Sequence, residues 1–285
     1  MTESESALIA ALTVIGRLPG AEVQAGADGT WVASGRPLDS LNHVLRLERQ
    51  GTDAMIEARI DRIDAALRQQ GSVPSTWWIG PSTAPPDLAR RLSARGFTDA
   101  EPEYGMVIDV AGVASPGGDV ELVEDAAGLD AFLGVMAAAH GWSDDRSAAW
   151  AELYRTPIAG PERPWWHVLV RRDDQPAACA SLFATGEHAF VTNVGTIPAA
   201  RGAGLGTTAT LAVLEIAAGL GFRRASLTAS VMGRGVYARI GFREDARLAR
   251  SISPVIQLAD PAPPGGPTFS RLPPSVDVRR SSDRR

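Results

Sequence analysis

The chain has 285 residues, 33 acidic and 28 basic side chains and a formal net charge of −5 at pH 7. This charge argues against a general nucleic-acid or anionic-membrane partner, and the length is near that of two domains. No apolar run reaches the length of a membrane span, and the start at Met1 lacks the basic segment of a signal peptide. A cytoplasmic protein without a nucleic-acid or membrane partner is therefore expected.

The first half has the pattern of a small α+β domain. Strands are predicted over residues 42–47 and 75–80, and isoleucines recur at helical spacing over residues 52–69. Residues 91–97, Arg-Leu-Ser-Ala-Arg-Gly-Phe, predict a short helix that ends at a glycine before a last strand. We expect these elements to form a domain over residues 1–110.

A Gly- and Ala-rich linker is predicted over residues 111–118, and a second domain follows it. Its expected elements are a strand over 120–123, helices over 127–139 and 146–155, and strands over 166–171 and 177–185. The strands are joined by short polar turns, which favour antiparallel pairing. The pattern predicts a mostly antiparallel mixed sheet with helices packed on it, the α+β class.

A strand over residues 189–194 leads into a glycine-rich turn and a helix. Pro198 ends the strand, residues 201–206 are expected to form the first helical turn, and Gly219 ends the helix. The free N–H groups at a helix start and the positive end of its dipole attract anions, and glycines allow a close approach. The junction therefore predicts a pyrophosphate site.

Two common phosphate loops fit this turn poorly. A P-loop needs Gly-Lys-Ser/Thr, whereas the chain contains no lysine and all 28 basic residues are arginine. A Rossmann turn places its glycines directly after the strand and an acid at the end of the next one. Here Pro198 and five further residues intervene, and the predicted next strand, 224–230, ends without an acid.

Two motifs resemble those of the GNAT N-acetyltransferase superfamily. Residues 201–206, Arg-Gly-Ala-Gly-Leu-Gly, resemble its Arg/Gln-x-x-Gly-x-Gly/Ala signature. Residues 236–242, Val-Tyr-Ala-Arg-Ile-Gly-Phe, resemble its Tyr-x-x-x-Gly-Phe element, at the expected downstream distance. The alternative is a helix start whose glycines serve packing alone. The resemblance implies an acetyl-CoA-binding catalytic domain, expected over residues 119–257.

The first half resembles a degenerate copy of the same domain. Gly96 and Gly241 end similar motifs and lie 241 − 96 = 145 residues apart, about one domain. The joint at residues 48–55 has one glycine and an acid, and Leu92 stands where the second copy has Tyr237. The expected fold is therefore two GNAT-like domains of the α+β class, in tandem. The alternative is coincidence between two ordinary αβ units.

The resemblance implies roles for residues of the second half. Backbone groups after Asn193 would pair with the pantetheine arm, and the helix start with Arg201 would hold the pyrophosphate. Tyr237 would protonate the leaving thiolate, since a phenol with a pKa near 10 keeps its proton at neutral pH; the alternative is a packing role. The cofactor-binding residues are expected to be Gly195, Thr196, Ile197, Arg201, Gly202, Ala203, Gly204, Leu205, Gly206 and Thr207. Tyr237 and Asn193 are the expected catalytic residues.

The general base and the acceptor stay open. Besides Asn193, the candidate bases are His188, His140, Asp144, Asp145 and Glu152. The tryptophans that could line an acceptor pocket or belong to the core are Trp142, Trp150, Trp165 and Trp166.

No metal is expected, because the four histidines lack ligand spacing and Cys179 is the single cysteine, expected to be a small core residue. The residues and the resemblance together predict an acetyl-CoA-dependent N-acetyltransferase with a small-molecule or peptide amine acceptor. The alternative is a non-catalytic acyl-CoA-binding or regulatory module. Residues 258–285, rich in proline and arginine, are expected to form a disordered tail.

Overall fold

The computed structural model describes residues 1–47, 51–155, 160 and 163–255. Residues 1–254 form one compact unit, and a second unit spans Val255–Arg285, of which Val255 alone is described. The predicted tail at 258–285 lies outside the described residues, as does part of the first-half joint at 48–55. Within the described part of the chain, no helix is both long and apolar enough to cross a membrane.

The first half contains the predicted series of strands and helices, and two helices and two strands of the described residues precede that series. From residue 42 onward, the order strand, helix, strand, helix, strand is confirmed. The elements are α1 (Glu3–Thr13), η1 (Val14–Arg17), β1 (Glu22–Gly26), β2 (Gly29–Ala33), β3 (His43–Leu47), α2 (Asp53–Gln69), β4 (Thr76–Ile79), α3 (Leu88–Ser93) and β5 (Thr98–Asp109).

The second half repeats that order from β9 onward. Its elements are β6 (Asp119–Leu122), α4 (Ala126–His140), α5 (Asp144–Tyr154), β7 (Trp165–Arg172), β8 (Gln175–Thr185), β9 (His188–Thr196), η2 (Pro198–Ala200), α6 (Leu205–Gly219), β10 (Arg224–Ala229), α7 (Arg234–Ile240) and β11 (Arg243–Ile252). The prediction that residues 201–206 form a helical turn is wrong for its first part. Gly202 and Gly204 have φ of +81° and +79°, which a right-handed helix excludes, so α6 begins at Leu205.

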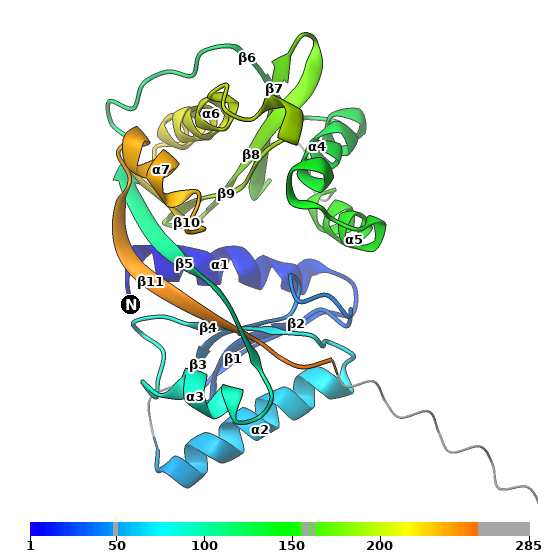
Figure 1. Cartoon of the computed structure of the whole chain (residues 1–285), viewed down its shortest axis with the longest axis vertical. Helices are drawn as coiled ribbons and strands as arrows, with labels where there is room; N and C mark the ends of the chain where they lie inside the picture. Colours follow the sequence, from blue (N-terminus) through cyan, green and yellow to red (C-terminus); the bar gives the residue numbers. More distant parts are fainter. Residues whose placement is uncertain (48–50, 156–159, 161–162, 256–285) are drawn as a thin grey trace, which may run out of the picture. The chain divides into compact units, whose positions relative to one another are not determined.

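A single sheet of eleven strands runs through both halves, in the order β1-β2-β3-β4-β11-β5-β10-β9-β8-β7-β6. Among the strands of the described residues, β3–β4 and β9–β10 are the only parallel pairs. The last strand of each half lies beside strands of the other half, because β5 pairs with β10 and β11 pairs with β4. In Figure 1, β5 and β11 run as two long neighbouring strands between the two sets of elements. The sequence predicts a sheet for each half, and this strand exchange joins them.

Helices pack on the sheet in separate layers (Figure 1). One core joins α1, α4 and α5 to side chains such as Trp78 and Phe190. A second core lies beneath α6, and a third lies between α2, α3 and the first-half strands. The predicted linker at residues 111–118 falls between β5 and β6, inside the compact unit.

Helix α1 docks closely on the exchanged strands. It begins in a capping box at Thr2, and Ser4 donates hydrogen bonds to Asp245 of β11. A Cβ at Gly105 of β5 would collide with Ser4, and one at Gly80 would collide with Glu5, so both glycines permit this close approach. The result is that a first-half helix packs against β9 and β10 of the second half.

Candidate active site

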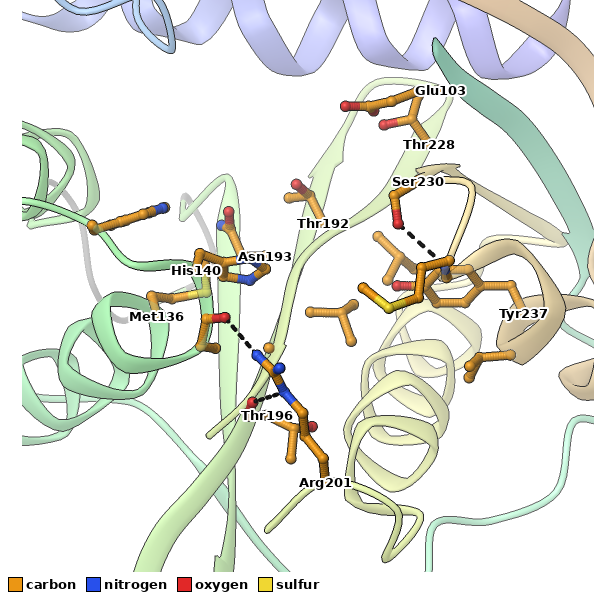
Figure 2. Close-up of a pocket in the computed structure, with 18 of the residues that line it drawn as sticks. Glu103, Met136, His140, Thr192, Asn193, Thr196, Arg201, Thr228, Ser230 and Tyr237 are labelled. Carbon is orange, nitrogen blue, oxygen red and sulfur yellow. Dashed lines mark hydrogen bonds between the residues drawn. The ribbon is translucent and has the colours of Figure 1, made fainter. Parts of the chain in front are cut away.

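The predicted site lies where β9 and β10 separate. These strands pair in parallel only at Phe190 and Val191, opposite Ser226 and Leu227. Beyond these residues a cavity of about 700 Å³ opens, with Thr192–Thr196 on one side and Thr228, Ser230 and Tyr237 on the other. Figure 2 shows Tyr237 facing the strand that carries Thr192 and Thr196 across this space. The edge of β9 that faces β10 therefore has no strand partner here.

A bulge in β9 shapes this edge. The register with β8 shifts between Cys179 and Ser181, and Asn193 adopts a φ of +53°. Its amide Nδ2 donates to the Tyr154 hydroxyl at 2.7 Å and to the Ser181 hydroxyl at 3.1 Å. Asparagine tolerates this left-handed conformation better than most residues, so the Asn193 backbone can adopt the bulge. The hydrogen bonds of its side chain then hold the bulge in place. Asn193 lines the cavity, and its amide nitrogen is engaged within the protein.

The bulge also decides which backbone groups face the cavity. Ile197 donates its N–H to Ala177 and accepts from Ala200, so both of its backbone groups are already paired. Because hydrogen-bonding direction alternates along an antiparallel strand, Gly195 also points toward β8, and Val194 and Thr196 face the open edge. Of the expected backbone partners, Thr196 lies on this open edge, whereas the backbone groups of Gly195 and Ile197 are directed toward β8.

The glycine-rich turn leaves the start of α6 uncapped. Gly204 is the N-cap residue, and no side chain accepts a hydrogen bond from the first helical N–H groups. The first helical hydrogen bond runs from Thr208 to Gly204, so the N–H groups of Leu205, Gly206 and Thr207 precede it. A Cβ at Gly206 would lie 3.3 Å from the Thr196 hydroxyl, which places the helix start beside the end of β9. These exposed donors fit an anion.

Arg201 links the glycine-rich turn to α4 and to the end of β9 through hydrogen bonds. Its Nη2 donates to the carbonyl of Ala139 at 2.9 Å and its Nε donates to the carbonyl of Thr196 at 3.3 Å (Figure 2). A Cβ on Gly195 would lie 3.0 Å from the Cβ of Ala139, so the glycine permits this contact between strand and helix. Arg201 lines the cavity while it holds the C-terminal end of α4.

Tyr237 reaches the cavity from α7. The helix is capped by Gly241, which has a φ of +116°, and the chain turns there. The Phe242 ring packs edge-on against the Tyr237 ring, with 5.9 Å between the ring centroids. The hydroxyl points toward the cavity in Figure 2. Burial raises the pKa of Tyr237 to about 12, and the carboxylate of Glu103 adds to the rise. The phenol therefore keeps its proton throughout the neutral range.

Of the other candidate bases, only His140 lines the cavity. Burial lowers the pKa of His140. A hydrogen bond to the Val194 backbone opposes this fall, and the charge of Arg201 adds to it, so the imidazole is neutral at pH 7. His188 contacts the Ser6 hydroxyl, and Glu152 forms an ion pair with Arg36. The remaining candidates, Asp144 and Asp145, lie in the first turn of α5 and do not line the cavity.

Glu103 is a site residue that the sequence did not indicate. It lies on β5, a first-half strand, and lines the cavity near Thr228 (Figure 2). Its Oε1 forms an ion pair with Nη1 of Arg250, and the two atoms are 3.0 Å apart. No local pattern marks this glutamate, because only the strand exchange brings β5 beside β10.

The tryptophans that the sequence left open divide between site and core. Trp142 lines the main cavity, and Trp150 and Trp165 line a second one of about 170 Å³. Trp166 lines neither cavity, and its ring lies under the guanidinium of Arg163 at 3.6 Å.

Cys179 is a buried core residue, as expected. Burial raises the pKa of its thiol to about 12, which leaves it unsuited to nucleophilic attack. The described residues contain no group of three or more His, Cys, Asp or Glu side chains that could hold a metal.

Residues 132–242 match the model of a family described as the Acetyltransferase (GNAT) family. The matched span contains β9, the glycine turn and Tyr237. It does not reach the first half of the chain. No match was found among curated proteins.

Solved structures are similar over most of the chain. A GCN5-related N-acetyltransferase from Kribbella flavida has a TM-score of 0.69 and 20% identity, covering 90% of this chain and 98% of that one. A functionally unknown conserved protein from Staphylococcus epidermidis has a TM-score of 0.65 and 13% identity, covering 81% and 93%. A tandem GNAT protein from the clavulanic acid biosynthesis pathway has a TM-score of 0.58 and 16% identity, covering 86% and 87%. At these identities the likenesses show the fold alone, which is an α+β fold like that of these GNAT structures.

Proposed function

We propose that the chain is an acetyl-CoA-dependent N-acetyltransferase in which an amine attacks the thioester directly. The observation that carries the proposal is the run of features along one cavity: an uncapped helix start, an open strand edge and the Tyr237 hydroxyl. A cosubstrate with a pyrophosphate, an amide-bearing arm and a thioester matches these three features in that order. The family match over residues 132–242 supports the same reading.

The cosubstrate is held by backbone groups. The N–H groups of residues 205–207 and the glycine turn receive the pyrophosphate. The arm pairs with the N–H groups of Val194 and Thr196 on the edge of β9, because their carbonyls already accept from His140 and Arg201. Among the described residues of the first half, the corresponding helix start differs. Thr52 caps α2 by accepting from the Met55 N–H, and Asp53 places a negative charge in the first turn. We therefore propose that only the second half binds acetyl-CoA.

The transfer needs a proton donor and a proton acceptor. The amine nitrogen forms a bond to the thioester carbonyl carbon as the carbon–sulfur bond breaks, and the leaving thiolate takes the proton of Tyr237. Tyr237 is available for this role because its raised pKa keeps the hydroxyl protonated at neutral pH, so that it still carries the proton when the thiolate leaves. The nitrogen releases its own proton to His140 or Glu103, both of which line the cavity.

We propose that the chain is a tandem of two GNAT-like copies, over residues 1–110 and 119–257, the first of them degenerate. Both halves contain a parallel strand pair joined by a helix, β3-α2-β4 and β9-α6-β10, followed by a short helix and a long strand. Similarity to a structure described as a tandem GNAT protein supports this arrangement.

The proposal is tested on the full chain in two steps. Calorimetry measures acetyl-CoA binding, and thiol release is then followed across a panel of primary amines and peptides. Binding together with amine-dependent thiol release is expected. Binding without release for any amine would favour the non-catalytic acyl-CoA-binding alternative, and absence of binding would refute both.

A further inference from the structure

A second cavity, of about 170 Å³, adjoins the main cavity. The two share four lining residues, Glu103, Thr192, Asn193 and Thr228. The shared residues lie at the divergence of β9 and β10, and they include Glu103, whose charge acts on Tyr237, the residue that the proposed function sets beside the thioester sulfur. A group bound in the second cavity would thus have its reactive end at that point.

The wall of the second cavity is apolar and largely aromatic. Trp150 and Tyr154 come from α5, Trp165 from β7, and Trp78 from β4. Helix α1 supplies the remaining aliphatic side chains, which are Leu8, Ala11 and Leu12. The wall thus combines elements of both halves of the chain.

The shared mouth carries one negative charge. Among the described residues that line either cavity, Glu103 is the only acidic one. Arg250 contacts its Oε1, and no contact of its other oxygen with a described residue is seen. The Arg250 guanidinium is itself bound to the carbonyl of Glu101, which fixes the orientation of the carboxylate. One carboxylate oxygen is left to accept from a ligand.

Size limits what the second cavity can hold. An apolar protein cavity of about 150 Å³ holds one molecule of benzene. A volume of about 170 Å³ therefore admits one six-membered ring or a short branched alkyl group. Sugars and polyamines fit poorly, because their polar groups would be buried against tryptophan and leucine.

We propose that the acceptor is a primary amine with one compact aromatic or branched apolar group. Its apolar body fills the second cavity, and its ammonium binds Glu103 at the mouth. The ammonium passes one proton to His140 before the neutral nitrogen attacks, and the second proton goes to Glu103 as the amide forms. This inference rests on the proposed function, and it assigns the first half a role: α1, β4 and β5 build the acceptor subsite.

The charge is tested by comparing benzylamine with benzyl alcohol, which has the same ring without the cation. Binding is followed through tryptophan fluorescence, which requires no turnover. The wild type should bind benzylamine about tenfold to 100-fold more tightly, the strength of a hydrogen bond to a charged group. Glu103→Gln should remove this difference. Glu101→Gln, on the same strand and outside both cavities, should retain it. An unchanged preference in Glu103→Gln would overturn the assignment.

The apolar subsite is tested by filling it. In the wild type, kcat/KM for benzylamine should exceed that for ethanolamine or spermidine by about tenfold to 100-fold, the contribution of burying one large apolar group. Ala11→Leu should lower the benzylamine value and leave the ethanolamine value unchanged. Should that variant fail to fold, Leu12→Ala enlarges the cavity and should shift preference toward 2-naphthylmethylamine.

The outcomes separate the two proposals. Thiol release that is fastest with spermidine or ethanolamine, or a benzylamine rate indifferent to both cavity variants, overturns the acceptor class while the acetyltransferase stands. Failure of the full chain to bind acetyl-CoA, or to release thiol with any amine, removes the function itself.

Discussion

At the scale of single residues, Tyr237 has two candidate roles, one in catalysis and one in packing. Its ring packs on Phe242, and its hydroxyl lies at the cavity with a pKa raised to about 12. These observations separate the roles of ring and hydroxyl, so removing the oxygen alone tests the chemistry.

Tyr237→Phe should leave acetyl-CoA affinity nearly unchanged and lower the transfer rate by about 10²-fold to 10⁴-fold, the range of general acid catalysis. Single-turnover measurement is needed, because product release can limit the steady-state rate. Tyr104→Phe, whose ring lies beneath Arg234 outside the cavity, serves as the matched control. A wild-type single-turnover rate in Tyr237→Phe would assign the residue to packing.

His43 is a second residue whose protonation has a measurable effect, here on stability. It is buried, its Nδ1 accepts from the Trp78 indole at 3.2 Å, and its Nε2 donates to Ser40 at 3.0 Å. Burial lowers the pKa of His43 to about 4, and the charge of Arg250 adds to the fall. The hydrogen bond to Ser40 and the charge of Asp39 act in the opposite direction. The unfolded chain, with a histidine pKa near 6.5, binds the proton more readily.

The free energy of unfolding should therefore fall as pH drops from 6.5 toward 4, because His43 stabilises the fold only while it is neutral. Between pH 7.5 and 5 this group contributes a loss of about 2 kcal/mol. His43→Gln keeps an acceptor and a donor and should lack that loss. Urea unfolding of both proteins at the two pH values measures the difference, and parallel pH profiles would contradict the assignment.

At the scale of elements, α6 is distinguished by how it begins. Its first N–H groups are uncapped after two glycines of positive φ, whereas α2 begins at a threonine cap. Gly204 has open space around its Cβ position, so substitutions there are limited by backbone strain rather than by collision.

Gly204→Asp should weaken acetyl-CoA binding by about 30-fold relative to Gly204→Asn. The two side chains have the same shape and tolerate positive φ, so the difference isolates one negative charge beside the pyrophosphate. A unit charge about 8 Å away costs roughly 2 kcal/mol at an effective dielectric constant of 20. Calorimetry on both variants, with their thermal stabilities compared, makes the test. Equal affinities would remove the pyrophosphate from this turn.

At the scale of the whole molecule, the exchange of β5 and β11 joins the halves. Each of these strands pairs with the other and with a strand from the opposite half. A chain cut between β5 and β6 would leave β5 without both of its neighbours. The unit over residues 1–254 should therefore unfold cooperatively.

Ile60→Ala tests this coupling. Ile60 is fully buried in the first-half core, so its truncation should destabilise by about 2–5 kcal/mol. Urea unfolding should show one transition, and the substitution should lower its midpoint equally for tryptophan fluorescence and for far-UV circular dichroism. Two transitions, with only one displaced, would show that the halves unfold independently.

From residue 42 onward the sequence by itself determined the order of the elements, and it marked the glycine turn at which anion binding is proposed. Periodicity gave the strand, helix, strand order of each half, and glycine spacing marked the turn before α6, because these signals are local. The helix start was misplaced by four residues because glycine permits helical and left-handed backbone alike.

Only the tertiary structure decided the second cavity, where we propose that the acceptor binds. Glu103 and Trp78 belong to the first half in sequence, yet they meet Asn193 and Trp165 around the second cavity. This meeting depends on the exchanged strands and on the close docking of α1 at Gly105. Pairing between distant strands is set by the packing of whole faces, which no window of neighbouring residues contains. The proposed cosubstrate end of the site is thus encoded locally, and the proposed acceptor end exists only in the folded chain.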